Sequence, residues 1–156
     1  MRRALTFAIA ATVAAGVVAG CSSGGGTISK EDYAEAVVSA RDRVDFALAQ
    51  ITEGTGSLEE LIDRMNGAAD LIDEAADDFD DAGTAQGFED ETTKLVAAFH
   101  QLAAGLAGTA HDASQPGFEG LLTGSNALQF PGWTKANRVL ASLDEQGIAV
   151  EPIPTH

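Results

Sequence analysis

Carboxylates form the densest group of chemically active side chains in the sequence. They crowd the stretch Asp70–Asp81 and return after a short turn at Glu89–Glu91. A hard divalent cation needs about six to eight oxygens that converge on it. The stretch therefore suggests binding of a divalent cation or small ligand, with these candidates: Asp73, Asp77, Asp80 and Asp81.

The spacing of these acids does not favour a built metal site. It distributes the side chains over several faces of a helix, and no Asp-x-Asp-x-Asp-Gly loop occurs. A solvated acidic surface is the favoured interpretation, and cation or small-ligand binding is the alternative.

The other motifs that would indicate catalysis or a cofactor are absent from the sequence. A di-iron bundle needs Glu-x-x-His, but His100 follows Ala97 and His111 follows Gly108 at that spacing. There is no Cys-x-x-Cys-His for haem attachment. His111 and Ser114 share one loop, whereas hydrolase triads are assembled from separate elements. We expect neither enzymatic activity nor a cofactor.

Three long segments repeat apolar residues at alternating spacings of three and four, which places each set on one stripe of a helix. The first stripe comprises Tyr33, Val37, Ala40, Val44, Ala47 and Ile51. The second comprises Leu58, Leu61, Met65, Ala68, Ile72, Ala75 and Phe79. The third comprises Phe88, Thr92, Leu95, Phe99, Leu102 and Leu106.

Polar residues and glycines delimit these helices. Ser29 with Asp32, and Ser57 with Glu60, have the spacing of amino-terminal cap pairs. Thr84 is the expected cap of the third helix. The expected helix ends are Gly54, Gly83 and Gly108.

The remainder predicts one further helix and a tail. A helix is expected from Trp133 to Gln146, with Trp133 packed as a hydrophobic staple at its entry rather than exposed as a partner anchor. Ile148–Ile153 alternates apolar and polar residues but contains Pro152, which indicates an extended tail on the helices. The fold class expected for residues 29–156 is therefore all-α, an antiparallel bundle of three to four helices.

The amino terminus has the layout of a signal peptide. Arg2 and Arg3 precede an apolar stretch from Ala4 to Val18, and small residues follow. The stretch is shorter than the roughly 20 residues of a membrane-spanning helix. Residues 1–20 are therefore expected to direct export and to be removed.

Val18, Ala19, Gly20 and Cys21 then resemble the lipobox of bacterial lipoprotein precursors position by position. The resemblance implies diacylglyceryl transfer to the Cys21 sulfur and cleavage between Gly20 and Cys21, with N-acylation as a further option. An ordinary signal peptide with a cut near a lone cysteine is the alternative. Lipidation would account for the chain's single cysteine, which has no disulfide partner.

Residues 21–28 would then form the lipidated cysteine and a flexible Ser/Gly tether, which leads to the helical domain 29–156. The net charge of −15 disfavours a nucleic-acid partner. Composition resembles that of small lipoproteins of high-GC Gram-positive bacteria. The sequence predicts a lipoprotein on the extracytoplasmic face of the cell membrane, a non-enzymatic helical module that binds an envelope protein.

Overall fold

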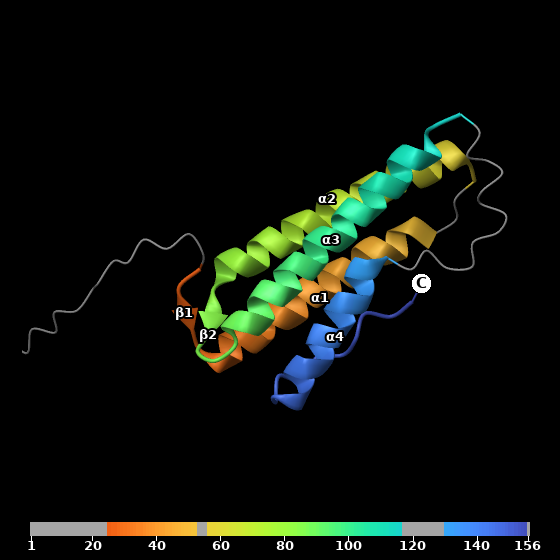
Figure 1. The fold of residues 1–156 in the computed structure, drawn as a ribbon. Helices are drawn as coiled ribbons and strands as arrows, with labels where there is room; N and C mark the ends of the chain where they lie inside the picture. Colours follow the sequence, from red (N-terminus) through yellow and green to blue (C-terminus); the bar gives the residue numbers. More distant parts are fainter. Residues whose placement is uncertain (1–24, 53–55, 117–129, 156) are drawn as a thin grey trace, which may run out of the picture.

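The computed structural model describes residues 25–52, 56–116 and 130–155. In this part of the chain four helices dominate: α1 (Lys30–Thr52), α2 (Leu58–Ala82), α3 (Glu89–Ala113) and α4 (Pro131–Glu145). Two short strands, β1 (Thr27–Ile28) and β2 (Thr84–Ala85), pair in parallel. Figure 1 shows the three long helices side by side, with the shorter α4 beside them. The predicted helical class is confirmed.

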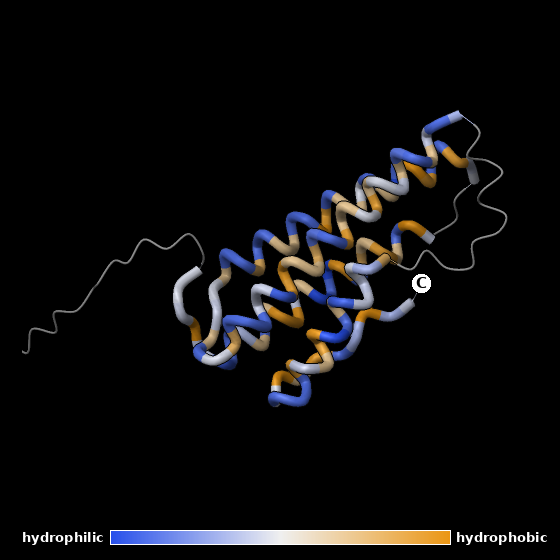
Figure 2. The backbone as a smooth tube through the Cα atoms, in the orientation of Figure 1, coloured by the Kyte–Doolittle hydropathy of each residue, from blue (hydrophilic) through white to orange (hydrophobic). Residues whose placement is uncertain are grey.

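The helices pack through the predicted stripes. α2 packs on α1 and α3, and α3 also packs on α4. Figure 2 shows hydrophobic and hydrophilic segments alternating along each helix, as single apolar stripes require. The largest fully buried side chains include Tyr33, Phe99, Met65, Ile72, Leu95 and Leu140. Alanine fills much of the remaining core, as at Ala68, Ala75, Ala76, Ala98 and Ala103.

The first two predicted caps are present. Ser29 Oγ accepts a hydrogen bond from the Asp32 amide, and Ser57 Oγ accepts one from the Glu60 amide. The Glu60 carboxylate accepts from the Gly56 amide, one residue before the cap. This bond, together with the Arg64 guanidinium, lowers the pKa of Glu60. Gly83 ends α2 with a positive φ of 98°, which favours glycine.

The predicted bounds of the third helix were wrong at both ends. Thr84 does not cap it but lies in β2, opposite Thr27. α3 begins at Glu89 after Phe88, and it runs through Gly108 to Ala113 because a single helical glycine costs only about 1 kcal/mol. Of the predicted tether, residues 25–28 are described, and they contact the helical domain: Thr27 pairs with Thr84, and the Gly25 amide donates to the Asp80 carbonyl.

A buried aromatic cluster lies where β1 and β2 meet the helices. The Tyr33 ring contacts Phe79 and Phe88, at centroid distances of 5.9 and 5.2 Å. Its hydroxyl bonds Thr92 Oγ1 at 3.0 Å, and Thr92 in turn donates to the Phe88 carbonyl. Burial raises the pKa of the Tyr33 phenol. This hydrogen-bond chain ties α1 to the start of α3.

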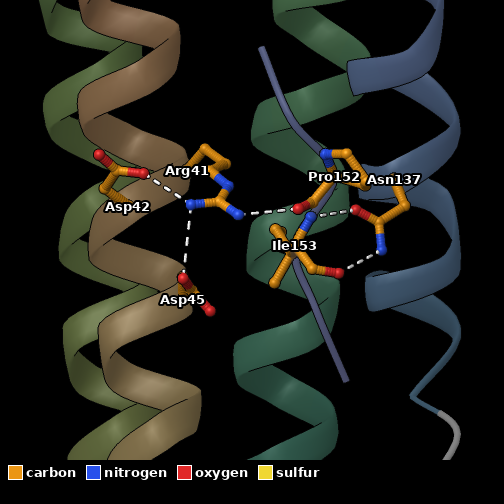
Figure 3. A network of polar contacts seen from close by, with 6 residues as sticks. All are labelled: Arg41, Asp42, Asp45, Asn137, Pro152 and Ile153. Carbon is orange, nitrogen blue, oxygen red and sulfur yellow. Dashed lines mark hydrogen bonds and ion pairs between the residues drawn. The ribbon is translucent and has the colours of Figure 1, made fainter. Parts of the chain in front are cut away.

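The carboxyl-terminal residues form the predicted extended tail. Ile148, Val150 and Ile153 are buried. Figure 3 shows the tail between α1 and α4: Arg41 donates to the Pro152 carbonyl at 2.8 Å, and the Asn137 amide pairs with both backbone groups of Ile153. The tail thus connects two helices that its apolar side chains also help to cover.

α3 and α4 approach closely at two glycines. The Phe130 ring lies over Gly105, and Gly132 lies against the α3 backbone. A Cβ on Gly132 would lie 2.3 Å from the Leu102 nitrogen and 2.7 Å from the Ala98 oxygen. Trp133 is half-buried against the core beside this contact. The Gly132 contact therefore sets the separation of the two helices.

We predict that Gly132→Ala lowers the free energy of unfolding by about 1–3 kcal/mol, because the methyl group would overpack the α3–α4 contact. Gly67→Ala is the matched control: it lies in α2 with open space around its Cβ position, and it should stabilise the helix by up to about 1 kcal/mol. Denaturant unfolding followed by circular dichroism measures both. A Gly132→Ala variant as stable as the parent would contradict the close contact.

Candidate functional site

An open apolar groove of about 830 Å³ runs along α1 and α2. Its floor includes Val38 and Phe46 from α1 and Leu71 from α2. Among the described residues, these are the large hydrophobic side chains that remain exposed, at 36%, 61% and 39%. The remaining lining residues are Ala34, Glu35, Ser39, Asp42 and Arg43. The groove therefore collects the apolar surface that the fold leaves uncovered.

Helix geometry explains why these residues are exposed. The buried stripe of α1 passes through Val37 and Val44, so Val38 and Phe46 project to one side of it. On α2, Ile72 belongs to the buried stripe, and its neighbour Leu71 lies on the exposed side. The fold is complete without these three side chains.

Charged side chains border the groove. Glu35 and Asp42 come from α1. Arg43 reaches across to α2, where it forms ion pairs with Asp78 and with Glu74, the latter at 3.7 Å. Exposed ion pairs of this kind contribute about 0–1 kcal/mol. The groove is therefore lined by two acids of α1, and two further acids lie on the α2 side, paired with Arg43.

The four predicted metal candidates do not form one site, although two of them contact the same His100 ring. Asp73 contacts His100 Nδ1 at 2.6 Å, whereas Asp77 lies 3.5 Å from His100 Nε2, on the other side of the ring. Asp80 and Asp81 are exposed further along α2. Within the described ranges, no group of three or more His, Cys, Asp or Glu side chains is placed to hold a metal ion.

The other polar residues considered from the sequence, His100, His111 and Ser114, do not form one site either. His100 contacts Asp73 of α2, and His111 is exposed near the end of α3. Ser114 Oγ donates to the His111 backbone carbonyl at 2.6 Å, not to its ring. This contact belongs to the end of the helix.

The lipobox residues Val18, Ala19, Gly20 and Cys21 lie outside the described residues. No helix in the described part combines the length and the apolar character needed to cross a membrane.

Comparison with known proteins gave no match to a family model, to a curated protein or to a solved structure.

Sequence reasoning missed the groove because it followed the apolar stripes and ignored the apolar residues beside them. The signal was available: Val38 and Phe46 are eight residues apart, close to two helical turns, and share one face of α1. The position of Leu71 beside Val38 and Phe46 could not be predicted from the sequence, because it depends on how α1 and α2 pack.

Two neighbouring valines on α1 test whether the groove side chains are dispensable for folding. Val37 is fully buried and Val38 is 36% exposed. Val37→Ala should lower the free energy of unfolding by about 2 kcal/mol, through lost burial and a residual cavity. Val38→Ala should change it by less than about 0.5 kcal/mol. Equal losses in urea unfolding would show that Val38 belongs to the core.

Proposed function

We propose that this chain is a lipid-anchored extracytoplasmic lipoprotein whose domain, an antiparallel four-helix bundle, binds a partner protein through the α1–α2 groove without catalysing a reaction. The single observation that carries the binding function is the gathering of Val38, Phe46 and Leu71 over one open groove. Exposed apolar patches of this kind mark interaction surfaces in soluble domains.

Contacts between helix ends support the antiparallel order. The Gln50 carbonyl near the end of α1 accepts from Arg64 near the start of α2. Thr27 before α1 pairs with Thr84 after α2. At the other side, Gln146 after α4 contacts Glu91 near the start of α3. Helix pairs that meet start to end in this way run in opposite directions.

The chemistry of the groove indicates an amphipathic helix with basic flanks as the partner segment. An apolar floor between two helices is the surface on which the apolar face of a third helix is bound. Glu35, Asp42, Glu74 and Asp78 would face the basic flanks. A second copy of this chain is disfavoured as the partner. If two grooves faced each other, the acids of one would repel the same acids of the other.

The groove should bind a synthetic amphipathic peptide with leucines on one face and lysines on the other. Replacing Phe46 and Leu71 with serine should weaken that binding at least about tenfold, since large central side chains dominate such interfaces. Isothermal calorimetry on the full chain measures it. The Ala104→Ser/Ala107→Ser variant, changed on exposed α3 positions, is the control and should bind like the parent.

A peptide with glutamates in place of the lysines should not bind. Equal affinity of the parent and the Phe46→Ser/Leu71→Ser variant for the lysine peptide would show general charge attraction and contradict the groove as the binding site.

The anchor rests on the lipobox resemblance and on the charged, apolar and small-residue order of residues 1–20. Two or more acyl chains are needed for stable attachment, because one chain binds only marginally. A diacylglyceryl group on Cys21 meets this requirement. The net charge of −15 repels anionic membrane surfaces. Attachment to such a membrane would therefore depend on the lipid and not on the charge of the domain.

Mass spectrometry of the protein from native membranes should find Cys21 as the first residue, with a diacylglyceryl group on its sulfur. In the Cys21→Ala variant both the lipid and cleavage after Gly20 should be lost, whereas Ser22→Ala should keep both. A free Cys21 thiol in the membrane-bound parent, or a mature chain that starts at another residue, would refute the anchor.

A further inference from the structure

A second groove, of about 350 Å³ between α3 and α4, has the opposite charge to the rest of the molecule. Lys94 and Gln101 of α3 line it with Lys135 and Arg138 of α4. Three of the chain's nine lysines and arginines therefore share one small concavity in a protein of net charge −15. Among the described residues, no carboxylate lines it.

The other basic side chains of the described part each contact acceptors of the chain itself, although Arg41 Nε is buried without a hydrogen-bond partner. Arg41, Arg43 and Arg64 form ion pairs with neighbouring carboxylates. Lys30 donates to the Gln146 carbonyl and lies over the Phe88 ring. These contacts show how readily such an acidic chain provides acceptors for its cations.

The groove cations differ from this pattern. Lys135, like Lys30, donates to a neutral oxygen, here the Gln101 amide oxygen at 2.7 Å, so this contact does not balance its charge. Within residues 25–52, 56–116 and 130–155, Lys94 and Arg138 have neither an ion pair nor a hydrogen bond to the protein. Three like charges gathered without a counterion repel one another, and an anion between them would relieve that repulsion.

The remaining walls are apolar. Ala97 is exposed, whereas Ala98 and Val139 belong to the core and close the groove from below. A planar guanidinium and two ammonium groups suit the oxygens of a phosphate, and the alanine and valine walls suit an adjoining apolar group.

We infer that the α3–α4 groove is a binding site for a phosphate-bearing anion, with Lys94, Lys135 and Arg138 as its ligands. The phosphate can be that of a phospholipid headgroup or of a free phosphate compound, and both present the same chemistry to these three side chains. The site is independent of the α1–α2 groove, since the two are formed by different helix pairs.

Titrations followed by NMR on the full chain in maltoside micelles test this site. The probes are inorganic phosphate, short-chain phosphatidylglycerol and, as a zwitterionic comparison, short-chain phosphatidylcholine. We expect saturable shifts at the amides around Lys94 and Arg138 with phosphatidylglycerol, with inorganic phosphate, or with both. Binding of the lipid alone assigns a headgroup site, and binding of phosphate as tightly as the lipid assigns a free phosphate compound.

Lys94→Gln/Arg138→Gln should weaken the binding of the active probe at least about tenfold, because it removes two charge-assisted contacts. Lys30→Gln/Arg64→Gln removes the same charge elsewhere and should retain it. The amino-terminal apolar segment is present in both variants, so its effect cancels. Equal weakening by both pairs, equal binding of phosphatidylcholine, or no saturable binding of either anion would overturn the inference. Circular dichroism confirms that each variant is folded.

Discussion

The single apolar stripe on each helix is the constraint on which this structure depends. Most of the remaining surface of each helix is polar, so a helix can bury its stripe only against the other helices. Packing α1 on α2, α2 on α3 and α3 on α4 covers most of the apolar surface. The tail completes the cover: Ile148, Val150 and Ile153 are buried, and Figure 3 shows Pro152 and Ile153 between α1 and α4.

Because the core uses so much of the apolar surface, the exceptions identify the surfaces available for binding. Phe46, at 61% exposed, has no role in the core, and it shares its groove with the two other large exposed hydrophobics. A similar exception in charge occurs at the α3–α4 groove, where Lys94 and Arg138 lack the carboxylate partners that Arg43 and Arg64 have. The first groove collects apolar side chains that the fold leaves exposed. The second collects cations without carboxylate partners among the described residues.

Much of the fold could be predicted from the sequence because stripe periodicity and cap chemistry are local. The Ser29 and Ser57 caps and the buried stripes follow directly from spacing. The pairing of Thr27 with Thr84 could not be predicted, because it depends on where α1 begins relative to the end of α2. The grooves were missed for the same reason. Leu71, and Lys94 with Arg138, acquire their neighbours only through packing. The Asp70–Asp81 acids are close in sequence, yet within the described residues they take part in no group of three or more side chains placed to hold a metal ion.

Photocrosslinking in intact cells tests whether the α1–α2 groove binds a partner helix. A photoreactive phenylalanine analogue is placed at residue 46, or at exposed residue 104 on α3 as the comparison. We expect position 46 alone to crosslink reproducibly to one protein, within a basic amphipathic helix of that protein. The same crosslinks from both positions, or none from position 46, would contradict it.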